Sequence, residues 1–334
     1  MDGYRKEYQN KIGVLLTNLG TPKSPTRKDV KKYLNQFLSD KRVVDINRIL
    51  WIPILKLIIL TIRPSKSARL YQKIWTKEGS PLLVFMYKIK NKIIKILEKQ
   101  NTDYLIEVGM RYGEPSIENA LTKMKKNKVS KIVVFPLYPQ AGSPTTSTTL
   151  DEISRIFSKW PWVPELRFIN GYHDNNDYIN ALSKSIENAS KKEGVPEKIL
   201  FSYHGMPKRY LNNGDPYYCF CHKTTRLVAE KLNLNKNQYD MSFQSRFGTE
   251  EWLKPYTDKT LVDYAEQNIK NVHIISPGFS VDCLETLEEI KIQYLDLFHK
   301  NGGKELHYIP CLNESDDHIK LIKTIIMDNI SGWK

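Results

Sequence analysis

The segment Ser202 to Pro207 reads Ser-Tyr-His-Gly-Met-Pro and places a histidine just after a short apolar run. The run Lys198 to Ser202 is typical of a buried strand, so His204 falls at a strand end, where a side chain can reach into a cleft. An imidazole with a near-neutral pKa can accept a proton or bind a divalent metal ion. The alternative is a histidine satisfied in the protein interior, which is the commoner fate of a lone histidine.

A second candidate is the acidic segment that follows Pro277-Gly278-Phe279-Ser280. If a helix starts near Asp282, then Glu285 and Glu289 lie one turn apart on one face, and Asp282 lies one turn before Glu285. These residues would then form a line of carboxylates along the helix. The alternative is a helix start whose acids complement the helix dipole, with Asp282 as the cap and Glu288 exposed to solvent.

Three further groups carry weaker signals. The segment Gly109-Met110-Arg111-Tyr112-Gly113 places a guanidinium and a phenol at the end of an apparent strand. Pro136-Leu137-Tyr138-Pro139-Gln140 follows another strand and precedes a run of serine and threonine, which often serves only turns and helix caps. Cys219-x-Cys221-His222 lacks the distant second ligand pair of a structural zinc site, so we expect no functional role for it.

Short apolar runs that alternate with longer helical stretches position these residues. We expect strands at 11–16, 104–111, 131–135, 166–170, 198–202, 239–243 and 272–276. We expect helices at 81–100, 116–126, 178–192, 224–232 and 316–329. Strands that alternate with helices predict parallel sheets covered on both faces, and ligands of such sheets bind at the carboxyl ends of the strands.

The turn that carries His204 has a counterpart near the N-terminus. Thr17-Asn18-Leu19-Gly20-Thr21-Pro22 follows the first apolar run and repeats the spacing of glycine and proline, with Leu19 in the place of His204. This repetition predicts an internal duplication. We therefore predict one domain over 11–172, a similar one over 173–312, and a last helix at 316–329 that packs back on the first.

The composition restricts the class of protein. The chain has 334 residues, of which 40% are hydrophobic and 26% charged, which suits two globular α/β domains. Its net charge of +14 attracts anions, but the basic residues form no long block, and we expect no nucleic-acid partner. Glycine motifs of dinucleotide and nucleotide sites are absent. Four cysteines and a polar stretch from Met1 to Lys11 predict a cytoplasmic protein without disulfides.

In their order and spacing these motifs resemble the ferrochelatase family, from Gly13 to about Ile319. The strongest matches are Ser202 to Pro207, Gly214-Asp215-Pro216-Tyr217, Phe279 to Thr286, Arg111-Tyr112, Tyr138-Pro139-Gln140 and Gly79-Ser80-Pro81. The resemblance implies an α/β fold of two similar Rossmann-like domains with the active-site cleft between them. It also implies a lyase that inserts Fe²⁺ into protoporphyrin IX and releases two protons, the terminal step of haem biosynthesis.

The resemblance assigns roles to the candidate residues. His204 and Glu285 match the catalytic, metal-contacting pair, and Asp282 and Glu289 match an acidic path behind it. Positions that match the porphyrin pocket are Arg111, Tyr112, Tyr138, Phe279 and Leu19. Fe²⁺ is then a substrate, and we expect no permanently bound cofactor. Because no cysteine follows Cys311, we also expect no iron–sulfur cluster.

The segment Ile49 to Ile62 is apolar except for Pro53, Lys56 and Thr61, and it is shorter than the roughly 20 residues that cross a bilayer. By resemblance it is a lip over the porphyrin pocket that also touches a membrane, while the alternative is an ordinary core helix. We expect a monomer attached peripherally to the cytoplasmic face of the inner membrane. Rival interpretations are a coproporphyrin III ferrochelatase or a cobalt chelatase and, in another class, a non-catalytic haem or metal carrier.

Overall fold

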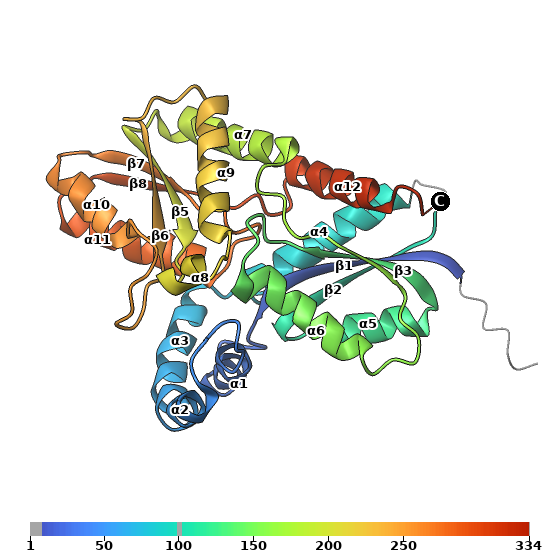
Figure 1. The fold of residues 1–334 in the computed structure, drawn as a ribbon. Coiled ribbons are helices and arrows are strands. Elements are labelled where there is room, and N and C mark those ends of the chain that lie inside the picture. The colour runs from blue at the N-terminus through green and yellow to red at the C-terminus, as the bar shows by residue number, and fades with distance from the viewer. Residues whose placement is uncertain (1–8, 99–101, 334) are drawn as a thin grey trace, which may run out of the picture.

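Two four-stranded parallel sheets organise the computed structural model, which describes residues 9–98 and 102–333 (Figure 1). The first sheet has the order β2-β1-β3-β4 and the second β6-β5-β7-β8. The strands are β1 (Gln9–Thr21), β2 (Tyr104–Gly113), β3 (Val129–Pro136), β4 (Glu165–Phe168), β5 (Lys198–His204), β6 (Tyr239–Gln244), β7 (Asn271–Ile275) and β8 (Glu305–Ile309). Residues Met1 to Tyr8 and the predicted helix end at Gln100 lie outside the described residues.

The two sheets repeat one topology. In each of them the first strand of the half lies between the second and the third, so that β1 pairs with β2 and β3, and β5 pairs with β6 and β7. Leu19 and His204 therefore occupy related places near the carboxyl ends of these two strands. The predicted fold class, two similar parallel α/β units, is confirmed.

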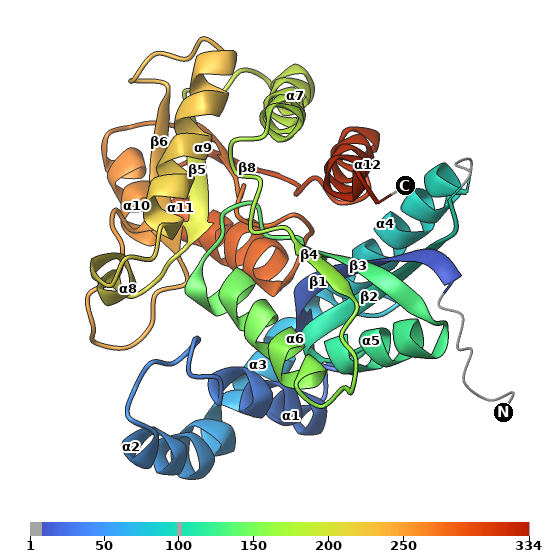
Figure 2. The same ribbon diagram turned by 45° about the vertical axis from the view of Figure 1, so that its right-hand side comes forward.

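Helices cover both faces of both sheets (Figures 1 and 2). They are α1 (Arg27–Leu38), α2 (Arg48–Pro53), α3 (Leu60–Ile74), α4 (Pro81–Leu97), α5 (Ile117–Lys126), α6 (Thr148–Phe157), α7 (Asn176–Glu193), α8 (Lys208–Asn212), α9 (Tyr217–Lys231), α10 (Thr257–Glu266), α11 (Leu295–Lys300) and α12 (Asp316–Ile330). Three π-helical segments join them, namely η1 (Ile54–Ile59), η2 (Ser143–Ser147) and η3 (Glu285–Tyr294).

Alternation along β1 shows how one strand serves two helical layers. Val14 and Leu16 face a core cluster that includes Met86 and Ile89 of α4, whereas Leu15 faces a separate cluster built with α5 and α6. Successive side chains of a strand point to opposite faces, so an uninterrupted apolar run fits a strand buried on both sides. The α4 cluster continues into the second half of the chain, where it takes in buried side chains of β5.

Helix α12 joins the two halves from the C-terminal end of the chain. It packs against α4 and β3 of the first half and against α7 of the second, and Figure 2 shows it between α7 and α4. Lys92 on α4 bonds to Asp316 at 2.8 Å, and Lys184 on α7 bonds to Asp317 at 2.7 Å. All strands of the first sheet precede residue 172, and all strands of the second sheet follow it. The predicted domain limits, 11–172 and 173–312, stay predictions.

The predicted strands match seven observed ones within a few residues, but β8 was not predicted. Its sequence Glu-Leu-His-Tyr-Ile is short and half polar, because it forms the edge of its sheet and leaves one side of the strand partly in solvent. Helix α6 was also missed, since its start lies in the run of serine and threonine that was read as a loop.

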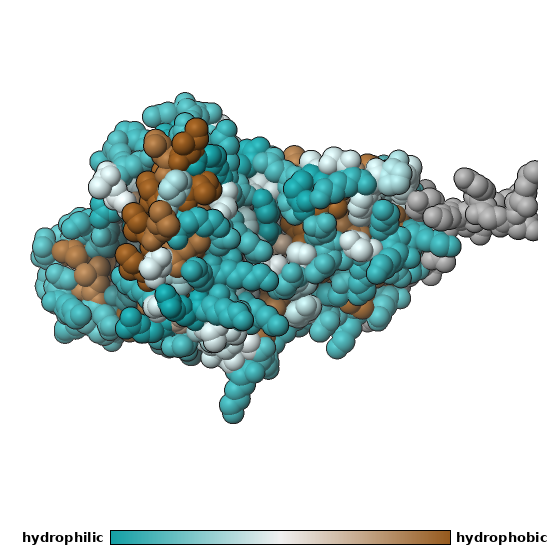
Figure 3. Space-filling model, turned by 90° about the horizontal axis from the view of Figure 1, so that it is seen from below, coloured by the Kyte–Doolittle hydropathy of each residue, from teal (hydrophilic) through white to brown (hydrophobic). Residues whose placement is uncertain are grey.

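The apolar segment near residue 50 forms a projecting lip, made of α2, η1 and α3. Its inner face buries Trp51, Leu55 and Leu60 in a cluster with α1. Its outer face leaves large hydrophobic side chains in solvent, and Figure 3 shows apolar residues gathered on this part of the surface. They are Ile49, Leu50, Ile54, Leu57, Ile58 and Ile62. Among the described residues, no helix is both long and apolar enough to cross a membrane.

Candidate active site

His204 ends β5, and the next residue has to be glycine. A Cβ atom on Gly205 would lie 2.7 Å from the carbonyl oxygen of Gln244 and 3.1 Å from the ring of Trp252. The imidazole Nδ1 lies 2.7 Å from the carbonyl oxygen of Gly205. Because a carbonyl can only accept, Nδ1 carries the proton and Nε2 of a neutral ring keeps a free lone pair. The geometry therefore leaves His204 with a base at Nε2.

Glu285 and Glu289 lie on η3, a π-helix rather than the α-helix that the acidic pattern suggested. The helix begins three residues later than predicted, so Asp282 precedes it instead of opening it. Gln244, at the end of β6, donates from its side-chain amide to the carbonyl oxygen of Glu285 at 2.8 Å. Single π-helical turns are rare and often occur at functional sites.

Hydrogen bonds from the second half of the chain hold Glu289, and the charges of His204 and Glu285 both affect its pKa. The amide nitrogen of Ser245 donates to its Oε1 at 2.8 Å, the Ser245 hydroxyl donates to Oε2 at 2.5 Å, and the Tyr294 phenol donates to Oε1 at 2.8 Å. Burial raises the pKa of Glu289, as does the charge of Glu285, while the hydrogen bonds and His204 oppose the shift. The net direction is upward, so this carboxylate takes up a proton more readily than an exposed one.

Asp282 is close in sequence but has a different set of partners. Asn313 donates from Nδ2 to its Oδ2 at 2.7 Å, Thr286 donates to Oδ1 at 3.1 Å, and the phenol of Tyr308 also donates to Oδ1. The backbone nitrogen of Asp282 in turn donates to Asn313 at 2.9 Å. These contacts fasten the loop before η3 to the segment after β8, and they leave Asp282 buried.

Glu288 is not exposed, contrary to the sequence-based expectation. Its side chain is 1% exposed and forms an ion pair with Lys73 of α3 at 2.8 Å. The expectation assumed α-helical periodicity, with the helix dipole favouring acids in solvent. A π-helix advances fewer degrees per residue, so the face that each side chain occupies differs from the α-helical pattern.

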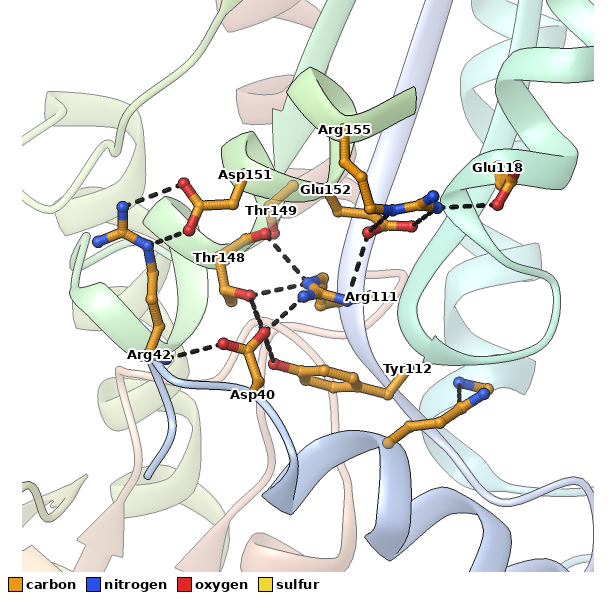
Figure 4. Close-up of polar contacts among 12 residues, drawn as sticks. Asp40, Arg42, Arg111, Tyr112, Glu118, Thr148, Thr149, Asp151, Glu152 and Arg155 are labelled. Carbon is orange, nitrogen blue, oxygen red and sulfur yellow. Dashed lines mark hydrogen bonds and ion pairs between the residues drawn. The ribbon is translucent and has the colours of Figure 1, made fainter. Parts of the chain in front are cut away.

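Arg111 and Tyr112 meet at Asp40, a residue that the sequence did not single out (Figure 4). The guanidinium of Arg111 pairs with Oδ2 of Asp40 and donates from Nε to the Thr148 hydroxyl at 2.7 Å. The Tyr112 phenol and the Thr148 hydroxyl also donate to Oδ2 of Asp40, at 2.8 and 2.6 Å. Arg111 further lies 3.8 Å from Glu152 of α6.

The charge of Asp40 is stabilised where it lies. Burial raises the pKa of this carboxyl, but the hydrogen bonds from Thr148, the Arg42 backbone and Tyr112, together with the Arg111 charge, outweigh that effect and lower it. Burial raises the pKa of the Tyr112 phenol, which stays protonated as a donor. No local sequence pattern marks Asp40, because Arg111 and Tyr112, which it holds, are 71 and 72 residues away.

The remaining pocket candidates surround these groups with apolar and aromatic surface. Tyr138 follows β3 and is buried, with no hydrogen-bond partner for its phenol in the described structure. The Phe279 ring centre lies 6.3 Å from that of His204. Leu19 packs against the cluster that includes the inner face of the lip. The structure thus brings Phe279 to His204, and Leu19 to the lip.

The site offers few ligands for a metal ion. In the chain segments that the structure describes, no three histidine, cysteine or acidic side chains are grouped as ligands of one ion. His204 offers one nitrogen and the neighbouring glutamates offer oxygens. Such a set binds a divalent cation weakly, which suits an ion in transit better than a resident one.

Comparison with known proteins gives a consistent result. The ferrochelatase family model matches residues 11–330. A ferrochelatase of Nitrosococcus oceani is 48% identical over 99% of this chain and 90% of its own length. Ferrochelatase 2 of Shewanella oneidensis is 49% identical over 95% of this chain and 97% of its own.

Solved structures support the fold. SirB from Bacillus subtilis with Fe³⁺ superposes with a TM-score of 0.57 at 11% identity, covering 96% of both chains. CbiX, described as the terminal enzyme of sirohaem biosynthesis in denitrifying bacteria, superposes with a TM-score of 0.51 at 12% identity, covering 96% of this chain and all of the other. At such low identity the likeness concerns architecture alone.

Proposed function

The chain belongs to the ferrochelatase family, and from this premise we propose that it inserts Fe²⁺ into protoporphyrin IX to form haem, the terminal step of haem biosynthesis. The observation that carries the proposal is the bond from His204 Nδ1 to the Gly205 carbonyl, which leaves Nε2 free to accept a proton. Porphyrin metallation needs such a base, because two pyrrole N–H protons must leave as one Fe²⁺ enters.

The proton balance requires more than one acceptor. Neutral His204 takes one proton at Nε2, and a second proton needs another base or the release of the first. Glu289 interacts with both His204 and Glu285, and its raised pKa suits it to take a proton from the imidazole and release it to solvent. We assign this acidic path to Glu285 and Glu289, and we give Asp282 the role of anchoring the loop before η3.

Iron delivery in this proposal relies on weak, temporary ligands. Glu285 and His204 contact Fe²⁺ before it enters the ring, and the porphyrin nitrogens then replace them. Nε2 of His204 has one lone pair, so it accepts a pyrrole proton only after the ion has left it. A closed set of thiolates would retain the ion. The proposal includes neither an iron–sulfur cluster nor another resident cofactor, and an absorption spectrum of the purified protein without charge-transfer bands in the visible range is the expected observation.

The pocket around the macrocycle combines one polar end with apolar walls. Arg111 and Tyr112, held by Asp40, form the polar end, while Leu19, Tyr138 and Phe279 supply flat or aliphatic surface. Arg63 on α3 stacks over Phe247 at 5.4 Å, and burial lowers the pKa of its guanidinium while Glu285 raises it. A porphyrin propionate that reaches the mouth of the cleft would meet this cation.

We further propose that the outer face of the lip rests on a lipid surface. Six large hydrophobic side chains are exposed there, more than the scattered apolar residues of an ordinary surface. Lys66 and Arg69 on α3 are exposed and can meet anionic headgroups. The lip is part of the pocket wall, so an apolar porphyrin could pass between membrane and protein without crossing water. The sequence-based expectations of a monomer, without a nucleic-acid partner, complete the proposal.

A single assay tests the reaction. The protein is mixed with protoporphyrin IX and Fe²⁺ without oxygen, and haem is followed by its absorbance. Many turnovers per chain support the enzyme, while one equivalent of bound porphyrin without metallation indicates a carrier. Parallel reactions with coproporphyrin III and with Co²⁺ compare the rival substrates. We expect protoporphyrin to react faster, because its vinyl edge is apolar like the lip.

A further inference from the structure

An ion pair between Lys73 and Glu288 ties the lip to the helix that carries the catalytic acids. The Nζ atom of Lys73, near the end of α3, lies 2.8 Å from Oε1 of Glu288 on η3. The side-chain amide of Gln293 donates to the other oxygen. Glu288 is 1% exposed and Lys73 is 48% exposed. The buried carboxylate of Glu288 is thus paired with a half-exposed lysine that lies 215 residues earlier in the sequence.

Stability alone is a poor reason for this arrangement. A buried ion pair often stabilises a fold less than apolar side chains of the same volume would, because both charges lose water. Among the described residues, Lys73 is the cation within ion-pair distance of Glu288. What such a pair does secure is relative position, since the buried Glu288 carboxylate is strongly disfavoured without its cation.

The pair lies at one end of a seam between α3 and η3. At the other end Leu284 packs into the lip cluster together with Tyr71, which lies two residues before Lys73. Burial raises the pKa of Tyr71, and the charge of Glu285 raises it further. The Glu285 carboxylate therefore also lies near α3. The first turn of η3 therefore contacts the lip helix from Leu284 to Glu288.

Two neighbouring glutamates bind η3 to different parts of the molecule. Glu289 is held by Ser245 and Tyr294, which belong to the second half of the chain. Glu288 is held by Lys73, which belongs to the lip. Glu285 lies three residues before Glu288 on η3, so a movement of α3 reaches it through Glu288.

We propose that Glu288 is a positioning residue: its pair with Lys73 holds the lip helix at a fixed place relative to Glu285, and so sets where the porphyrin lies under the lip. The inference rests on the proposed metallation reaction. Loss of the pair loosens the lip, which weakens porphyrin binding before it affects the chemical step.

The test uses Lys73→Met, Glu288→Gln and the double variant in the full chain. Porphyrin affinity is measured without metal by quenching of tryptophan fluorescence, and KM and kcat are measured with Fe²⁺. Lys73→Met should raise the porphyrin Kd and KM about tenfold with a smaller change in kcat. The double variant should be no worse than Lys73→Met, because the two residues act as one unit. Lys73→Arg should restore wild-type binding.

Lys123→Met is the matched control. Lys123 pairs with the buried carboxylate of Glu107 on β2, away from the lip, at 2.5 Å. Lys90 also pairs with Glu107, at 2.8 Å, so loss of Lys123 should lower the melting temperature only slightly and leave porphyrin affinity unchanged. If Lys73→Met behaves like this control, with lower stability and unchanged Kd and KM, the positioning role is wrong. If the wild-type protein neither binds nor metallates porphyrin, the proposed function fails instead, and the two failures are distinguishable.

Discussion

The phenol oxygen of Tyr112 lies 2.8 Å from Oδ2 of Asp40, and this contact joins the end of β2 to the loop where the lip begins. The same carboxylate oxygen receives Arg111 and Thr148. Asp40 therefore fixes Arg111 and Tyr112, which we propose to line the pocket, and the base of the lip at once. Its lowered pKa keeps the carboxylate charged at neutral pH.

Replacing Asp40 with Asn should disturb both stability and porphyrin binding. The amide keeps the size of the side chain but removes the nearer charge opposite Arg111, which leaves this mostly buried cation with Glu152 alone, at 3.8 Å. We expect a loss of about 2–4 kcal/mol in the free energy of unfolding and a higher KM for porphyrin, measured by urea unfolding and steady-state kinetics. Asp151→Asn is the control, because its pair with Arg42 is exposed and should contribute under about 1 kcal/mol.

His204→Ala should lower the metallation rate at least about a hundredfold, since it removes the proposed base. The porphyrin Kd should change much less, because Phe279 and the lip remain. His222→Ala is the control: this histidine packs beside Tyr218 on α9 and has no assigned role in the reaction. A wild-type rate in His204→Ala would remove the imidazole from the mechanism.

Glu289→Gln should change the pH dependence of the rate. Because its pKa is raised, Glu289 becomes protonated at a higher pH than an ordinary carboxylate does. Once protonated, it can no longer accept a proton. In the wild type kcat should therefore fall as pH drops through that raised pKa. The variant should have a lower kcat and lack this acidic limb. Asp296→Asn on α11, an exposed position, should leave the profile unchanged.

His318 should make the fold sensitive to mild acid. Burial lowers its pKa to about 4, against a small opposing effect from its bond to the Asn313 carbonyl. In the unfolded chain the pKa of His318 is about 6.5, and in the native state it is about 4. Between these two pH values the unfolded chain binds a proton that the native state does not, so stability falls as pH falls. His318→Gln should flatten the slope between pH 6.5 and 5 by about 1.4 kcal/mol per pH unit.

Urea midpoints at several pH values measure this slope. His273 is also buried, and burial lowers its pKa to about 4, so the variant should retain part of the acid sensitivity. The exposed His299 provides the control His299→Gln, which should keep the wild-type slope. An unchanged slope in His318→Gln would show that this histidine is accessible to protons in the native state.

The lip should lose membrane affinity when its outer face becomes polar. The double variant Ile49→Ser with Leu57→Ser changes two of the most exposed apolar side chains, and we expect at least a tenfold weaker association with anionic phospholipid vesicles in a sedimentation assay. Val195→Ser is a matched control, because Val195 is 81% exposed and Ile49 82%, but Val195 lies outside the lip. Equal loss in both proteins would locate membrane contact elsewhere.

The sequence placed His204 correctly at a strand end because a buried strand followed by glycine has a strong local signature. Acidic spacing singled out Glu285 and Glu289 as candidates and the resemblance gave them roles, which stay predictions; the helix proved to be of the π type. Asp40 could not be found, because the need of Arg111 for a counter-ion does not say which of many acids supplies it. Glu288 was misplaced for a related reason: local periodicity describes a regular helix, and Lys73 is far away in sequence.

The shared strand order of the two sheets has a consequence for how such a chain could originate. Two identical copies of a half-length ancestor, paired about a twofold axis, would carry the same residue at both strand ends. Joining the copies in one polypeptide removes that constraint. One copy can then keep the apolar Leu19 while the other carries His204, so the two similar halves present different side chains at matching places.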